Sequence, residues 1–267
     1  MKNTMIGMLL TAAVLLIAGA CSKDEPSPST TFVLVHGAWQ GPYVWQYVKE
    51  GLEKKGHKVL VVELPAHGND NTSPANVSMD SYRDKVIEAI HSTNGKVVLV
   101  GHSLAGMVIS ATAEKIPSRI NKLVYLAAFI PVSGQNLLEL ASADAQSQLG
   151  PSLVPSADGL TLDIKSENRV AIFCQDGSET NKKLLIDNFR VEPAIPFGTP
   201  VSLTDAAFGK VAKYYIYTTE DKAIGIDLQK QMASAAGISK VYSVTSGHSP
   251  FLSTPDALTG ILLDIVK

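Results

Sequence analysis

Two residues, far apart in a chain of 267, have the types and settings that nucleophilic catalysis requires. Ser103 lies in Gly101-His102-Ser103-Leu104-Ala105-Gly106, directly after the apolar run 97–100, a pattern typical of a strand, a tight turn and the start of a helix. His248 lies in a loop of glycine and serine, Ser246-Gly247-His248-Ser249. Because a serine hydroxyl is a poor nucleophile until a base removes its proton, we expect Ser103 and His248 to act together.

An acid that orients the histidine and donors that bind an oxyanion complete this chemistry. The loop after the apolar run 212–217 contains two candidate acids, Glu220 and Asp221. Spacing alone does not exclude Glu220, and we favour Asp221. For the oxyanion, topology places the backbone N–H of Ala38, in the loop after the run 31–35, with the N–H of Leu104.

The elements around these residues alternate between strand and helix patterns. Apolar, β-branched runs predict strands, and apolar residues at helical spacing predict helices. The expected strands are 31–35, 58–63, 97–100, 122–127, 212–217 and 240–244, and the expected helices are 45–55, 79–91, 104–115, 226–236 and 255–266. This alternation predicts an α/β fold with a mostly parallel sheet covered by helices on both faces. The loops that carry Ala38, Ser103, Asp221 and His248 would then share the carboxyl edge of the sheet.

The stretch 129–208 breaks this alternation. Its periodicity is poor, with scattered Gly, Pro, Ser and Asp and a short helical piece around 182–189. We expect an insertion over the sheet, within one domain spanning 31–267.

Composition narrows the classes of partner. A hydrophobic fraction of 45% with 18% charged residues indicates a buried core. A net charge of −2 without a Lys/Arg run argues against a nucleic-acid partner.

The first thirty residues predict export. Lys2 and the apolar run 5–20 have the layout of a secretory signal peptide over 1–20. Ala18-Gly19-Ala20-Cys21 resembles the lipobox of bacterial lipoproteins, with Ala18 where Leu is more usual, which implies acylation of Cys21 and attachment to a bacterial membrane on its periplasmic or surface face. An ordinary signal peptide with an incidental Cys21 is the alternative. Residues 21–30 read as a polar tether, and Cys174 is expected to be a packed, unpaired thiol.

Residues 31–267 resemble the α/β-hydrolase superfamily, in the branch of plant methyl-ester esterases, hydroxynitrile lyases and related bacterial esterases. The likeness lies in His36-Gly37-Ala38-Trp39, Leu99-Val100-Gly101-His102-Ser103, the Asp221 loop, Gly247-His248, and the order Ser, Asp, His. It implies a lid over the active site and neither metal nor cofactor. Ala105 departs from the family's usual G-x-S-x-G.

Two positions favour ester hydrolysis over cyanohydrin cleavage. Lyases of this type have Thr in the oxyanion loop and Lys after the catalytic histidine, where this chain has Gly37 and Ser249. The expected function is therefore a serine hydrolase that cleaves a small, fairly apolar carboxylic ester. The alternatives are lyase, thioester or amide chemistry in the same site, or a binding protein without turnover.

Further side chains are expected around this site. His36 and His102 are expected to fix loops by hydrogen bonding, and His67 to belong to a turn. Five aromatic side chains are candidates for lining an apolar substrate pocket: Trp39, Phe129, Phe173, Phe197 and Phe251.

Overall fold

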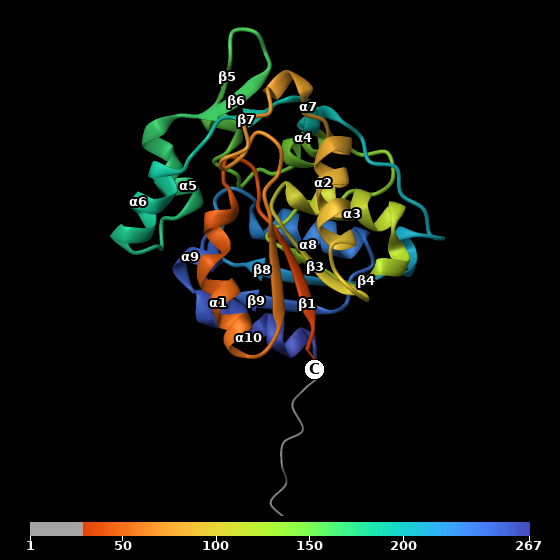
Figure 1. Cartoon of the computed structure of the whole chain (residues 1–267). Coiled ribbons are helices and arrows are strands. Elements are labelled where there is room, and N and C mark those ends of the chain that lie inside the picture. The colour runs from red at the N-terminus through yellow and green to blue at the C-terminus, as the bar shows by residue number, and fades with distance from the viewer. Residues whose placement is uncertain (1–28) are drawn as a thin grey trace, which may run out of the picture.

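A computed structural model describes residues 29–267, and a six-stranded parallel sheet forms its centre (Figure 1). The predicted signal peptide, Cys21 and most of the predicted tether lie outside the described residues. The strands have the order β2-β1-β3-β4-β8-β9. Their bounds are β1 Thr31–Val35, β2 Lys58–Val62, β3 Val97–His102, β4 Ile120–Leu126, β8 Ala212–Thr218 and β9 Val241–Val244.

The strand register aligns the ends of neighbouring strands. Val35 of β1 lies opposite Val62 of β2 and Gly101 of β3, and Thr218 of β8 lies opposite Val244 of β9. Because all neighbouring pairs are parallel, the loops that follow these strands leave the sheet at one edge. This edge contains the loops of Ala38, Ser103, Asp221 and His248.

Helices cover both faces of the sheet, as its apolar strands require. Every residue of β3 is buried, which only a strand covered on both faces achieves. Helix α1 packs against α10, and α2 packs against α3. The helices of this core are α1 Gln46–Lys54, α2 Met79–His91, α3 Ala105–Lys115, α8 Ile226–Ala235, α9 Pro250–Ser253 and α10 Pro255–Ile265. The predicted α/β fold is confirmed.

Two details of the helices show where local sequence is informative. Helix α2 begins as predicted at Met79, because the Ser78 side chain accepts a bond from the backbone N–H of Ser81 in a capping box. Helix α9, Pro250–Ser253, is a correction, because the sequence pattern predicts no helix before residue 255 in this region. Its four residues form a single turn after Ser249, which is too short to show helical periodicity.

Residues 129–208, called the cap below, lie between β4 and β8 in sequence. Figure 1 shows its small sheet, β5 to β7, at one end of the molecule. The cap contains α4 Leu137–Ser142, β5 Leu153–Pro155, β6 Thr161–Ile164, α5 Arg169–Phe173, α6 Glu179–Asp187, β7 Glu192–Pro193 and α7 Ile195–Gly198. Its three strands are antiparallel and were not predicted, because strands of two to four residues show no alternation of their own.

No helix among residues 29–267 has the length and apolar character needed to cross a membrane.

Candidate active site

Ser103 occupies a sharp turn between β3 and α3, as the sequence pattern predicts. Its φ of 56° lies in the left-handed region, which a residue with a side chain rarely adopts. Backbone bonds hold the turn: the Ser103 N–H donates to the Leu126 carbonyl at 3.3 Å, and its carbonyl accepts from Gly106 and Phe129 at 3.0 and 3.1 Å. The tertiary structure therefore fixes a strained serine at the carboxyl end of β3.

Close packing around this turn explains the unusual Ala105. A Cβ on Gly101 would lie 2.8 Å from the Ala105 carbonyl oxygen, and a Cβ on Gly106 would collide with the carbonyl oxygen of Phe129. Glycine is therefore required at 101 and 106. The methyl group of Ala105 is buried without such a conflict.

His248 is paired with Asp221. The His248 Nδ1–H donates to Asp221 Oδ2 at 2.8 Å, and both side chains are buried. Glu220, the competing acid, is exposed to solvent. Its backbone N–H donates to the Ser246 carbonyl at 3.0 Å, so Glu220 braces the histidine loop through its main chain.

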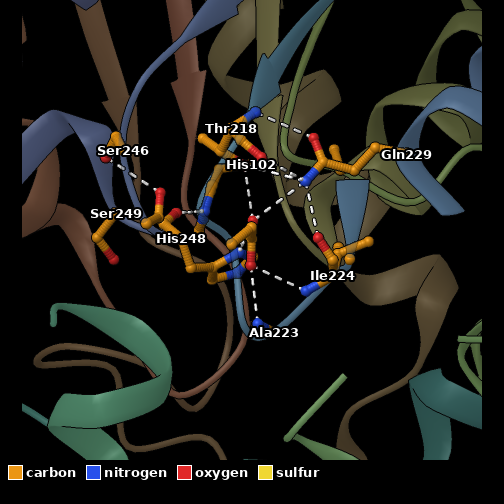
Figure 2. A network of polar contacts seen from close by, with 12 residues as sticks. His102, Thr218, Ala223, Ile224, Gln229, Ser246, His248 and Ser249 are labelled. Atoms are coloured by element: carbon orange, nitrogen blue, oxygen red, sulfur yellow. Dashed lines mark hydrogen bonds and ion pairs between the residues drawn. The ribbon is translucent and has the colours of Figure 1, made fainter. Parts of the chain in front are cut away.

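Four further donors surround the Asp221 carboxylate, as Figure 2 shows for the residues that supply them. The backbone N–H groups of Ala223 and Ile224 donate to Oδ1 at 2.8 and 2.9 Å. The Thr218 hydroxyl donates to Oδ2 at 2.7 Å, and the Gln229 amide lies 3.4 Å from the same oxygen. These donors fix the position of the Asp221 carboxylate. Nothing in the sequence pattern marks Thr218 or Gln229 for this role.

The second ring nitrogen of His248 is left open. Nε2 is buried and has no hydrogen-bond partner among the described residues. Since Nδ1 carries the hydrogen that faces Asp221, Nε2 of the neutral ring has a lone pair able to take a proton.

His102 and His36 hold loops, as expected. His102, which precedes Ser103, donates from Nε2 to the His248 carbonyl at 2.8 Å, and the two rings lie 4.5 Å apart. His36 donates from Nδ1 to the Gly37 carbonyl at 2.9 Å, and its Nε2 accepts from the Leu64 N–H at 3.2 Å. Burial, reinforced by the neighbouring His67, lowers the pKa of His36 to about 3, and burial with the nearby His248 lowers the pKa of His102 well below its usual value. Both rings are therefore neutral near pH 7.

The loop after β1 passes directly beside Ser103. A Cβ on Gly37 would lie 2.8 Å from Ser103 Cβ and 2.8 Å from His102 Nδ1. The next N–H group, of Ala38, has no acceptor among the described residues, and neither has the N–H of Leu104. Both predicted oxyanion donors are therefore without a partner in the described part of the chain, residues 29–267.

Trp39 connects this loop to the cap. Its backbone N–H donates to Glu192 Oε2 at 2.9 Å, and its indole N–H donates to the Leu162 carbonyl at 2.9 Å. The same Glu192 oxygen lies 2.7 Å from Nε2 of His67. His67 was predicted only as a turn residue. Its buried pairing with a residue 125 positions away left no local signal in the sequence.

A second connection joins the cap to the histidine loop. Asp176 Oδ2 accepts from the Ser246 hydroxyl at 2.8 Å and from the Gly247 N–H at 2.9 Å. The neighbouring Gln175 amide donates to the Glu220 carbonyl at 2.8 Å. The cap thus supports the loops of both His248 and Asp221.

The five aromatic candidates lie in different places. Phe173 lies 5.6 Å from the Trp39 ring and 5.7 Å from the His248 ring, and Phe197 lies 5.7 Å from Trp39. Phe129 is buried, and Phe251 packs against Trp45 and His102 at 4.9 and 4.7 Å. Phe173 thus links the cap to His248, and Trp39 links the loop after β1 to the cap, while Phe251 packs against His102, the residue before Ser103.

The cap leaves little of this site open to solvent. Ser103 is 7% exposed, and His248 is 1% exposed. Within residues 29–267, no three His, Cys, Asp or Glu side chains are grouped so that they could hold a metal ion.

Comparison with known proteins identifies the family to which this chain belongs. Residues 32–260 match the family model described as "Alpha/beta hydrolase family". A chloroplastic protein of Arabidopsis thaliana whose name includes "methylesterase 11" is 34% identical to this chain over 92% of this chain's length. The matched region spans 66% of the length of that protein. An alpha-hydroxynitrile lyase from the same plant is 28% identical, and the match covers 87% of this chain and 97% of the lyase.

Among solved structures, polyneuridine aldehyde esterase superposes with a TM-score of 0.81 at 25% identity, covering 90% of this chain and all of the other. The predicted likeness to the branch of plant methylesterases and hydroxynitrile lyases is confirmed. The chain belongs to the α/β hydrolase family.

Proposed function

We propose that this protein is a serine esterase that cleaves a small, fairly apolar carboxylic ester. The observation that carries the proposal is His248, whose Nδ1 is bound to the buried Asp221 while its Nε2 has no partner among the residues that the structure describes. This arrangement suits a base that takes a proton from a hydroxyl and returns it to a leaving group. Ser103 supplies that hydroxyl from the adjacent strained turn.

The reaction proceeds in two halves. Ser103 Oγ attacks the ester carbonyl while His248 Nε2 takes its proton, and the N–H groups of Ala38 and Leu104 bind the resulting oxyanion. His248 then protonates the departing alcohol, which leaves an acyl group on Ser103. Water, deprotonated by His248, attacks the acyl group and releases the acid, and Ser103 regains its proton. Asp221 stabilises the imidazolium formed in each half.

The names of the relatives favour this chemistry, since they include a methylesterase and polyneuridine aldehyde esterase. Gly37 argues against cyanohydrin cleavage, because the backbone at that position has no space for the threonine side chain that lyases of this type carry. Ser249 likewise provides no cation for a cyanide leaving group.

A fluorophosphonate probe tests the nucleophile directly, in parallel with hydrolysis of p-nitrophenyl acetate. We expect the probe to label the folded protein at Ser103, and Ser103→Ala to lose both labelling and hydrolysis. Ser110→Ala is the matched control, because Ser110 is a buried serine of α3, the helix that follows Ser103, and its hydroxyl donates to the Gly106 carbonyl. Absence of labelling in folded wild-type protein would refute the mechanism. Cyanide release from mandelonitrile without ester hydrolysis would favour the lyase.

We further propose that Cys21 is acylated and anchors the protein to a bacterial membrane, on its periplasmic or surface face. The support is the run Ala18-Gly19-Ala20-Cys21 in the sequence. Cys21→Ser is expected to abolish incorporation of labelled palmitate and to move the protein into the soluble fraction. Cys174→Ser is the matched control, because Cys174 is a buried free thiol in the cap. Membrane retention of Cys21→Ser would contradict the anchor.

A further inference from the structure

Glu192, in strand β7 of the cap, is a carboxylate with no solvent exposure and three hydrogen-bond partners. Oε2 accepts from the Trp39 N–H at 2.9 Å and from His67 Nε2 at 2.7 Å. Oε1 accepts from the Tyr82 hydroxyl at 2.9 Å. These partners belong to the loop after β1, the loop after β2 and helix α2. A single cap residue therefore joins three separate parts of the core.

The hydrogen bonds of His67 identify its charge. Nδ1 lies 2.9 Å from the Pro65 carbonyl, which can only accept, and Nε2 faces the carboxylate of Glu192. Both ring nitrogens therefore donate, and the ring is an imidazolium. Burial alone would lower its pKa, but the charge of Glu192 and the bonds to Glu192 and Pro65 outweigh burial and the repulsion by Arg190, so the pKa is raised. The neighbouring His36 ring, 4.8 Å away, is neutral.

Trp39 is where this cluster reaches the active site. Its φ of 58° is left-handed, a conformation that a bulky residue adopts only when its surroundings impose it. The cap imposes it with bonds from the Trp39 N–H to Glu192, from the indole to Leu162, and from the Arg190 N–H to the Trp39 carbonyl at 3.1 Å. The residue before Trp39 is Ala38, whose N–H has no partner within residues 29–267.

We propose that Glu192 is a positioning residue, whose carboxylate holds the Trp39 peptide group and thereby fixes the Ala38 N–H that binds the oxyanion. This inference rests on the proposed esterase function. It makes transition-state stabilisation depend on the cap being seated against the core. Substrate binding does not depend on it, because the oxyanion develops only after attack.

The test compares Glu192→Gln with Glu114→Gln in hydrolysis of p-nitrophenyl acetate by the full protein. Glu114 is the matched control, because its carboxylate also accepts three bonds that tie a cap segment to a helix: Thr204 N–H at 2.9 Å, Thr204 hydroxyl at 2.7 Å and Phe208 N–H at 3.2 Å. Glu192→Gln is expected to lower kcat about 10- to 100-fold with KM changed less than about twofold. Glu114→Gln is expected to leave both unchanged.

Tyr82→Phe is a second, milder variant that removes only the bond to Oε1. We expect its kcat to fall about two- to fivefold at constant KM, with a melting temperature close to that of wild type. Hydrogen exchange over residues 36–41 supplies a readout without turnover, and it is expected to accelerate in Glu192→Gln and not in Glu114→Gln.

The outcomes separate this inference from the function on which it rests. Wild-type protein that neither hydrolyses the ester nor reacts with the fluorophosphonate refutes the esterase and this inference together. Normal wild-type turnover, with kcat equal in wild type, Glu192→Gln and Tyr82→Phe, refutes the positioning role alone. A rise in KM at constant kcat would also refute it, because the loop would then serve ground-state binding.

Discussion

Asp221 and Glu192 are the two buried carboxylates of residues 29–267, and each holds a histidine. The separations are alike, 2.8 Å to His248 and 2.7 Å to His67. The difference lies in the far side of each ring: His67 bonds through both nitrogens, whereas Nε2 of His248 has no partner among residues 29–267. Burial and pairing with a carboxylate therefore do not by themselves identify a catalytic histidine, and neither does an open nitrogen, since Nδ1 of His102 is also without a partner in this part of the chain. His248 combines the two: a carboxylate holds one nitrogen, and the other has an open lone pair that can take a proton from substrate or nucleophile.

The largest expected effect distinguishes the two histidines. His248→Gln should lower kcat for p-nitrophenyl acetate by about 10⁵- to 10⁶-fold, because it removes the only base the mechanism uses. His67→Gln should lower kcat by no more than about 100-fold, through the oxyanion loop. Steady-state kinetics of both purified variants provides the measurement. Similar losses in the two would erase the distinction drawn from the open nitrogen.

The acid partner of His248 is expected to rank next. Asp221→Asn should lower kcat about 10⁴-fold, because the amide no longer stabilises the imidazolium or selects the tautomer. Glu220→Gln is the matched control, since Glu220 is exposed and supports the site through its main chain alone. Equal losses in these two variants would reopen the choice of acid.

Removing the carboxylate of the other pair is expected to affect stability. Glu192→Leu leaves the His67 imidazolium buried without its counter-ion, and breaking a buried pair in this way typically costs about 3–5 kcal/mol. Urea unfolding at pH 6 measures the loss, with the half-buried Glu114→Leu as comparison. A loss for Glu192→Leu no larger than for Glu114→Leu would show that His67 is neutral in the folded protein.

Two adjacent histidines are expected to respond to pH in opposite directions. The pKa of His36 is about 3, so below pH 6.5 the unfolded chain takes up a proton that the folded chain refuses, and stability falls as pH falls from about 6.5 to 3. The pKa of His67 is raised, so its contribution is complete below pH 6.5 and is lost as pH rises through the folded value.

His36→Gln keeps an acceptor for the Leu64 N–H and removes one titrating group. The acid-side dependence of the unfolding free energy should become shallower by about 1.4 kcal/mol per pH unit. Chemical unfolding between pH 6.5 and 4 provides the data, and an unchanged slope would argue against a neutral His36.

The smallest effect concerns the support of Asp221. Gln229 is buried and donates to the Thr218 hydroxyl at 3.0 Å and to the Ile224 carbonyl at 2.7 Å. Gln229→Leu should lower kcat about tenfold by loosening the acid. Gln231→Leu, at an exposed position of the same helix, should have no effect. If both variants behave alike, the network shown in Figure 2 does not position Asp221.

Sequence reasoning was most informative where structure is local. The apolar runs located all six core strands, and α2 begins at Met79 as predicted, because the capping box of Ser78 and Ser81 involves neighbours in sequence. The turn at Ser103 was likewise visible, since its glycines and serine are contiguous. What escaped was long-range. Glu192 looks like any surface glutamate in sequence, and only the folded chain brings it to Trp39, 153 positions away.

The cap was harder to predict for a related reason. Its strands have two to four residues and its helices four to nine, so few show a clear repeat of their own pattern. Its contacts with the core join residues such as Asp176 and Gly247 across 71 positions. Scattered Gly and Pro indicated an interruption of the alternation. They contained no information about which cap side chains face the site.

The turn at Ser103 also determines which substitutions this chain can accumulate over generations. Position 105 accepts a methyl group, whereas any side chain at position 106 meets the Phe129 carbonyl oxygen. Divergence is therefore expected at the fifth place of G-x-S-x-G and is blocked one residue later. A motif search that insists on glycine at the fifth place will overlook hydrolases built this way, and one that asks for G-x-S-x-x-G will retrieve them. In a randomised library of positions 105 and 106, active clones should retain glycine at the second and vary among small residues at the first.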